Sequence, residues 1–184
     1  MRVRGDFKMK APVMRLFVAV NFNAVMLDSL CKAADALKAR SDSGVFTKKE
    51  NFHITLAFIG ETDRIADAKR VIDETVFTPF KISLGSPGRF KRDDGDIRYL
   101  SAEGEGLAAL ALDIAARLRK DGFDIESRAF TPHITLGRRV IDKSGIPLDI
   151  IPASMTVNRV SLMKSEMLNG GMKYTEIHYK EAII

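Results

Sequence analysis

The sequence predicts an α+β fold of two lobes related by a pseudo-two-fold axis, with antiparallel sheets lining a central cleft and helices packed outside. Two observations carry this prediction. The tetrapeptide His-Ile-Thr-Leu occurs twice, at residues 53–56 and 133–136, and each copy follows a strand-like segment and an amphipathic helical segment in the same order. The other strands are short and are joined by turns or helices, which favours hairpins over a doubly wound parallel sheet.

The first half begins with a predicted strand over Arg15–Val20, and Asn23 is a suitable N-cap for the helix that follows. Apolar residues then recur at helical spacing at Leu27, Leu30, Cys31, Ala34 and Leu37. A loop containing Gly and Ser leads through Phe46 to the first histidine strand, which Gly60 ends.

A second helix is predicted from the spacing of Ile65, Ala68, Val71 and Ile72, and it stops before Pro79. A further strand follows over Phe80–Leu84. The segment from Pro87 to Asp96 is rich in turn formers and basic residues, so we expect a mobile loop there.

The second half repeats the order of strand, helix and histidine strand. A strand is predicted over Ile97–Ser101, and the second histidine strand comes about ten residues after Gly122, the expected C-cap of the helix. The tail offers strands at Thr156–Met163 and Tyr174–Tyr179, joined by a turn through residues 169–171. The helix itself shows a regular stripe of Leu107, Leu110, Ala111, Ile114, Ala115 and Leu118.

Length and composition set the outer limits. The 184 residues, 46% of them hydrophobic, suffice for one two-lobed domain over residues 12–184, after a flexible N-terminal leader at residues 1–11. The net charge of +5 makes an anionic partner plausible. Cys31 is the only cysteine, which suits a reducing cytosol, and no apolar run is long enough to cross a bilayer. We expect a cytoplasmic monomer with no membrane partner.

The repeated tetrapeptide points to one shared site. The probability that two of the three histidines are followed by the same three residues by chance is on the order of one in a thousand. On a strand, residues two apart share a face, so His53 lies with Thr55 and His133 with Thr135, while Ile and Leu take the other face. The same parity predicts that Phe52 and Phe58 are core residues.

This pair of faces suits displacement at phosphorus. The entering and leaving oxygens lie roughly in line, so a base and an acid must stand on opposite sides of the phosphorus. One neutral and one protonated imidazole can do this, and the two threonine hydroxyls can donate to the non-bridging oxygens. Neither motif holds a carboxylate or a cysteine, so we expect no metal and no cofactor. Without a metal, a strained five-membered cyclic phosphate is the most suitable substrate.

The two H-x-T-x motifs resemble those of the 2H phosphoesterase superfamily, most closely the RNA 2',3'-cyclic phosphodiesterases, also called 2'-5' RNA ligases. The resemblance covers nearly the whole chain from Met14, and it includes 50–60 around the first motif, 15–19, Arg138, Leu162, Ser165, Gly171 and Tyr174. It implies a two-lobed phosphoric diester hydrolase that opens 2',3'-cyclic phosphate ends to 2'-phosphates and joins tRNA halves reversibly through a 2'-5' linkage. Carried over by position, His53 is the general acid and His133 the general base. Tyr99 and Phe46 stand where tryptophan is common in the family.

The resemblance also implies that Arg138 binds the phosphate, whereas strand parity favours Arg139. Arg138 lies five residues after His133, so an ideal strand would turn it to the buried face. A bulge at Gly137 would return Arg138 to the cleft, because glycine tolerates such a kink. We therefore predict that Arg138 faces the cleft.

Other interpretations of the same residues remain open. The site could act on another small cyclic phosphate or on a 2'-5' oligonucleotide, or the motifs could bind RNA ends without catalysis. Metal binding is disfavoured, because two imidazoles without a third ligand make a poor zinc site. We interpret His178 as an ordinary strand residue. The basic residues near the motifs are either solvated charges or a track for an RNA backbone; they are Lys48, Lys49, Arg89, Lys91 and Arg92.

Overall fold

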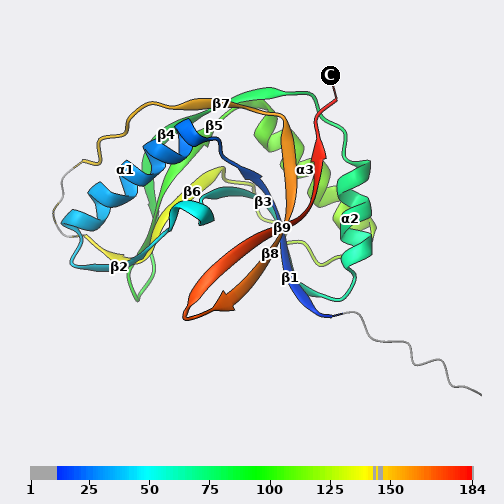
Figure 1. The fold of residues 1–184 in the computed structure, drawn as a ribbon, viewed down its shortest axis with the longest axis horizontal. Helices are drawn as coiled ribbons and strands as arrows, with labels where there is room; N and C mark the ends of the chain where they lie inside the picture. The colour runs from blue at the N-terminus through cyan, green and yellow to red at the C-terminus, as the bar shows by residue number, and fades with distance from the viewer. Residues whose placement is uncertain (1–11, 143, 145–146, 184) are drawn as a thin grey trace, which may run out of the picture.

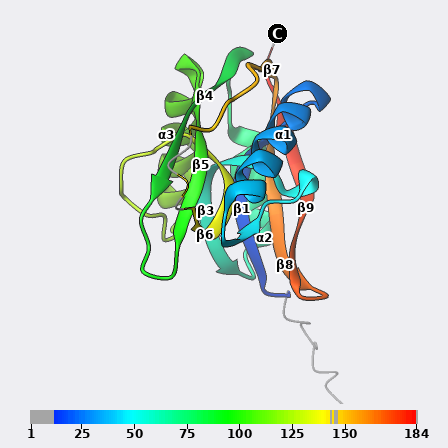
Figure 2. The same ribbon diagram turned by 90° about the vertical axis from the view of Figure 1, so that its left-hand side faces the viewer.

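The computed structural model describes residues 12–142, 144 and 147–183, so the predicted leader at residues 1–11 lies outside the described residues. Within this part of the chain, three α-helices accompany two antiparallel sheets (Figures 1 and 2). Sheet A has the strand order β3 (His53–Thr62), β1 (Met14–Asn21), β8 (Arg159–Leu168) and β9 (Gly171–Glu181). Sheet B has the order β2 (Ser43–Phe46), β6 (His133–Ile141), β5 (Asp96–Glu103), β4 (Phe80–Phe90) and β7 (Ser154–Val157). The predicted α+β class with antiparallel pairing is confirmed.

The two sheets repeat one arrangement, as the duplicated motif predicts. Strand β1, helix α1 (Ala24–Arg40) and strand β3 have their counterparts in β5, α3 (Glu105–Lys120) and β6. The register agrees residue by residue: Asn21 pairs with His53 as Ser101 pairs with His133. Two residues along, Ala19 pairs with Thr55 as Tyr99 pairs with Thr135. The two histidine strands therefore hold equivalent places in their sheets.

Both histidine strands also carry a bulge at the leucine of the motif. In β3, pairing with β1 steps from Thr55 to Ala57, and in β6, pairing with β5 steps from Thr135 to Gly137, so Leu56 and Leu136 are extra residues. A bulge reverses the facing of everything after it. Burial follows this reversal, because both residues after each threonine are buried and the next residue is exposed.

The helices bury the faces of the sheets that lie opposite the histidines. Helix α1 leads from β1 of sheet A to β2 of sheet B, and it packs on β2, β6 and β7 of sheet B. Helix α3 packs on β3 of sheet A and β4 of sheet B, and α2 (Ile65–Glu74) packs on β8 and β9. One cluster of buried apolar residues, which includes Leu16 of β1 and Ile134 of β6, joins the two halves.

Helix boundaries follow the local signals in the sequence. The side chain of Asn23 caps α1 by accepting a hydrogen bond from the backbone N–H of Met26 at 3.0 Å. Helix α3 ends at Lys120, and Gly122 adopts a positive φ of 81° just after the cap residue Asp121, which is the conformation that favours glycine. None of the described helices is long and apolar enough to cross a bilayer.

Three predicted boundaries were wrong. Residues 43–46 form the short strand β2 on the edge of sheet B, where a loop was expected. Strand β4 continues through Phe90, so most of the expected loop after Pro87 is a hairpin that turns at residues 91–95. The single strand expected at 156–163 is two strands in different sheets, β7 and β8, separated at Asn158. In each case the boundary depends on pairing with a partner strand, and local sequence does not reveal that partner.

Candidate active site

His53 is the first residue of β3 and is held on both sides of its ring. Nδ1 lies 2.7 Å from the carbonyl oxygen of Asn51, so Nδ1–H donates to that carbonyl and Nε2 is the unprotonated nitrogen of the neutral ring. Nε2 lies 3.0 Å from the hydroxyl of Thr55, which confirms that the two share a face. The rings of Phe17 and Tyr174 stand 4.9 and 5.1 Å from the imidazole, centroid to centroid.

His133 repeats this arrangement in sheet B. Its Nδ1 lies 2.7 Å from the carbonyl oxygen of Thr131, so Nε2 again is the nitrogen that can exchange a proton. Two aromatic rings again flank the imidazole, Phe90 at 5.2 Å and Tyr99 at 5.5 Å. These two rings also stack on each other, with centroids 4.5 Å apart.

The structure brings the two histidines into one electrostatic environment. Strands β3 and β6 contact each other where the two sheets meet. Burial lowers the pKa of His53 to about 4, and the nearby charges of Arg138 and His133 also lower it, against the hydrogen bond to Asn51. Burial likewise lowers the pKa of His133, with Arg138 again contributing. Both imidazoles are therefore neutral in the free site at pH 7.

Arg138, not Arg139, belongs with the histidines. Its charge acts on both imidazoles, whereas Arg139 forms an ion pair with Asp94 at 3.0 Å and is 71% exposed. The bulge beside Gly137 explains the difference, because it turns Arg138 away from the face that Leu136 buries. Arg139 then adopts a φ of 53°, an uncommon conformation for a residue other than glycine.

The matching bulge in β3 overturns one prediction. Phe52 is buried as expected, but Phe58 is 47% exposed and is not a core residue. It pairs with Phe17 on the histidine face of sheet A, and the guanidinium of Arg15 lies 5.0 Å from its ring centroid. Phe58 is thus the counterpart of Arg138, and sequence parity failed because it assumed an unbroken strand.

The four aromatic rings around the histidines had no clear signal in the sequence as site residues. Phe17 lies on β1, Tyr174 on β9, Phe90 on β4 and Tyr99 on β5, so no common spacing links them. Gly88 makes room for Tyr99: a Cβ built there would stand 2.4 Å from Cζ of the tyrosine ring. The resemblance named Tyr99 and Tyr174, but it did not predict their packing against the imidazoles.

The remaining predicted residues lie apart from this centre. His178 pairs with Asp73 at 2.7 Å, as an ordinary strand residue would. Among the basic residues, Lys49 stands 3.7 Å from Asp28, and Arg89 stands 3.2 Å from Asp96, so both are partly neutralised. The described residues contain no group of three or more His, Cys, Asp or Glu side chains that could hold a metal ion.

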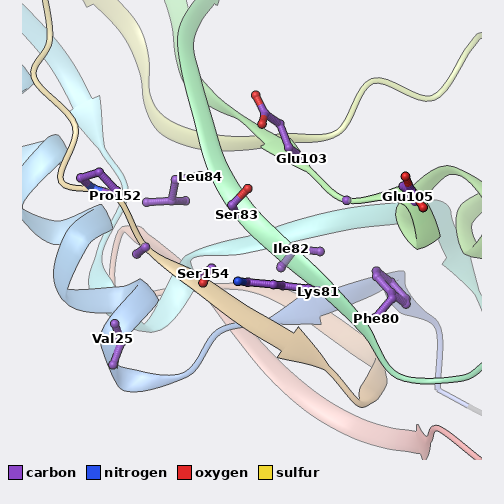
Figure 3. A pocket seen from close by; sticks show the side chains of 12 residues that line it. Val25, Phe80, Lys81, Ile82, Ser83, Leu84, Glu103, Glu105, Pro152 and Ser154 are labelled. Atoms are coloured by element: carbon purple, nitrogen blue, oxygen red, sulfur yellow. The ribbon is translucent and has the colours of Figure 1, made fainter.

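A cavity of about 930 Å³ opens at the other end of sheet B, and neither histidine lines it (Figure 3). It lies beside β4 and β7, near the first turns of α1 and α3, with Glu103 and Glu105 on its rim. The side chain of Lys81 points toward Ser154 there. This cavity therefore does not coincide with the paired motifs.

Comparison with known proteins agrees with the geometry. A relative from Methanothermobacter thermautotrophicus, named RNA 2',3'-cyclic phosphodiesterase, is 28% identical over 177 residues, covering 89% of this chain and 96% of its own. One of the same name from Archaeoglobus fulgidus is 36% identical over 131 residues, covering 68% of this chain and 72% of its own. The crystal structure of Escherichia coli LigT complexed with 3'-AMP superposes with a TM-score of 0.81 at 22% identity, covering 93% of this chain and 99% of that one. The family model described as the 2'-5' RNA ligase superfamily matches residues 26–167. The chain belongs to the 2'-5' RNA ligase superfamily.

Proposed function

We propose that this chain hydrolyses the 2',3'-cyclic phosphate ends of RNA or nucleotides to 2'-phosphates, with His53 and His133 as the acid-base pair. Family membership and the shared name of the relatives support the activity. The observation that carries the residue assignment is the matched pair of motifs. Equivalent strands present two imidazoles whose Nδ1 atoms are both occupied, and the charge of Arg138 reaches both rings.

Hydrolysis requires that one proton leaves the attacking water and that another is given to the leaving 3' oxygen. The Nε2 of the basic histidine takes a proton from water as the water oxygen bonds to phosphorus. The bond from phosphorus to the 3' oxygen breaks, and the Nε2–H of the other histidine gives that oxygen its proton. Thr55 and Thr135 donate to the non-bridging oxygens, and the Arg138 guanidinium balances the charge that gathers there. Ligation follows the same path with a 5'-hydroxyl in place of water: its oxygen bonds to phosphorus, the bond to the 3' oxygen breaks, and a 2'-5' phosphodiester remains.

We further propose His53 as the acid and His133 as the base, as the resemblance implies. The free site favours the opposite order, because the pKa of His53 is lowered to about 4 and its ring is the harder one to protonate. The bound phosphodiester is an anion and raises both pKa values, so His53 gains its proton only in the complex.

A sulfur leaving group tests this order. A thiolate at the 3' position leaves without protonation, so a 3'-thio cyclic phosphate should restore turnover to a variant that lacks the acid. We expect rescue of His53→Ala and no rescue of His133→Ala. Rescue of His133→Ala alone would reverse the roles and keep the pair.

Hydrolysis itself is tested with a defined substrate. The protein is incubated with an oligonucleotide that ends in a 2',3'-cyclic phosphate, with EDTA present, and the ends are separated by chromatography. A 2'-phosphate product is expected. No product under any condition rejects the function, and a product only after a divalent cation is restored rejects metal independence. A panel that includes a small cyclic phosphate and a 2'-5' oligonucleotide identifies the preferred substrate.

We propose in addition that residues 12–184 act as one domain and one monomer, because a single buried cluster includes side chains of both halves. Transfer RNA halves are proposed on the resemblance, and a cytoplasmic location is proposed on the single cysteine. Size-exclusion chromatography with light scattering checks the monomer. Competition between cleaved tRNA and short cyclic-phosphate oligonucleotides checks the substrate.

A further inference from the structure

A second cluster of charged side chains lies on the face of sheet B opposite His133. Arg89 of β4 and Arg98 of β5 pair directly in register, and like charges placed opposite each other on an antiparallel pair repel. Arg40, the last residue of α1, joins them around Asp142, which is almost fully buried. Together these residues border a cavity of about 340 Å³ whose wall includes Pro87 and Leu148.

The charges of this cluster do not balance. Asp142 lies 3.1 Å from Arg40 and 3.2 Å from Arg98, and both approach the same carboxylate oxygen, Oδ2. Arg89 has Asp96 at 3.2 Å. Three guanidiniums and two carboxylates leave one positive charge beside the cavity. The side chains of Arg40 and Arg98 are only 12% and 18% exposed, so water screens that charge less than it would on an open surface.

One donor in the cluster is buried without a hydrogen-bond acceptor, although it belongs to an ion pair. The Nε–H of Arg40 is close to Asp142 but is not directed at it, and among the described residues no acceptor takes its proton. A buried donor without a partner is costly, and guanidiniums are suited to planar contacts with phosphate oxygens. A ligand that supplies oxygen acceptors and a negative charge would offset the positive charge beside the cavity and accept hydrogen bonds from the guanidiniums that line it.

We propose that this cavity binds a phosphate-class oxyanion, held by Arg40, Arg89 and Arg98. The site is distinct from the histidine centre but lies directly behind it. Arg89 and Arg98 each precede one of the two rings that flank His133, Phe90 and Tyr99, and neighbouring residues on a strand face opposite ways. An anion bridging the two arginines removes their repulsion and stabilises the hairpin that carries those rings.

The test uses a protein whose histidine centre is disabled, so that it stands apart from the proposed function. In His53→Ala/His133→Ala, thermal unfolding is followed with 10 mM inorganic phosphate against chloride at equal ionic strength. We expect phosphate to raise Tm by about 3 °C, the size of effect that a millimolar site gives in a chain of this length. The absence of a phosphate-specific rise overturns the proposal.

Further variants locate the site. In the same background, Arg98→Gln should abolish the phosphate shift and Arg89→Gln should at least halve it, whereas Arg98→Lys, which keeps the charge, should retain part of it. Arg139→Gln is the matched control, because Arg139 is exposed and lies outside this cavity. A shift that survives Arg98→Gln unchanged comes from a different site and also overturns the proposal.

Two sources of the oxyanion are separated by a second probe. A dinucleotide with a free 3'-hydroxyl offers only a backbone diester. If it reproduces the Arg98-dependent shift, the cavity takes RNA backbone; if only inorganic phosphate does so, the ligand is a free phosphate or a monoester.

Discussion

The two histidine motifs show how one tetrapeptide in one register makes two different half-sites. His53 and His133 share their pairing, their Nδ1 contact and the bulge that follows. They differ in what the bulge turns outward, Phe58 in sheet A and Arg138 in sheet B. His53 is bonded to Thr55, while among the described residues no such bond joins His133 to Thr135. The shared motif therefore gives the two half-sites one geometry, and the residues that follow it make them different.

The largest expected effect comes from removing either imidazole. His53→Ala and His133→Ala should each lower kcat by about 10²–10⁴-fold, the usual contribution of general acid-base catalysis. The double variant should be far less impaired than the product of the two losses, because they act as a unit. His178→Ala, which removes the third histidine, should retain activity. Comparable losses in all three variants would mean that general instability, and not the site, is being measured.

The second comparison concerns the two adjacent arginines. Arg138→Ala should lower kcat by about 10²–10³-fold through lost charge stabilisation, while Arg139→Ala should stay within about twofold of the parent. Removing Arg138 should also raise the pKa of both histidines, since its charge lowers them. Steady-state kinetics with an NMR titration of the imidazoles gives both readouts. An inactive Arg139→Ala with a normal Arg138→Ala would restore the simple parity rule.

The threonines should matter less. Thr55→Val and Thr135→Val keep the shape and remove the hydroxyl, and we expect about tenfold lower kcat for each, with KM changing less. Because Thr55 also bonds His53, its variant should shift the pKa of that imidazole as well. Thr131→Val is a useful control, because Thr131 holds His133 through its backbone carbonyl and not its side chain.

The smallest effect is on stability and follows from the sign of the histidine pKa shift. The pKa of His53 is lowered from 6.5 to about 4, so the unfolded state binds more protons between those values and the free energy of unfolding rises with pH across that window. Acidification from pH 6.5 to 4 should cost about 3 kcal/mol through this group. Urea unfolding of His53→Gln should show a correspondingly flatter pH dependence. An equal slope in both proteins would place the pKa of His53 near its ordinary value.

Much of this site could be predicted from sequence because repetition is visible without knowing any contact. The pairing of His53 with Thr55 followed from strand parity, whereas Arg138 was predicted from the resemblance, and the glycine after Leu136 showed that the strand could hold the bulge that this prediction needs. The same bulge at Leu56 had no such marker, since Ala57 occupies the glycine's place, and Phe58 was misplaced for that reason. A bulge depends on the neighbouring strand, which periodicity within one segment does not record.

Sheet membership was equally hidden. Val157 and Arg159 are two residues apart, yet they belong to strands in different sheets. The compositions of β7 and β8 both suit a strand. They are separated only by their partners, because β7 pairs with β4 whereas β8 pairs with β1 and β9. The aromatic rings beside the histidines come from four strands and could not be assembled without that pairing.

The packing of helix α1 has a consequence for how this molecule can be divided. It follows β1 of sheet A but packs on β2, β6 and β7 of sheet B, while α3 packs on strands of both sheets. A polypeptide carrying residues 12–75 would lack β6 and β7, two of the three strands on which α1 packs, so we expect that the first half of the repeat does not fold by itself.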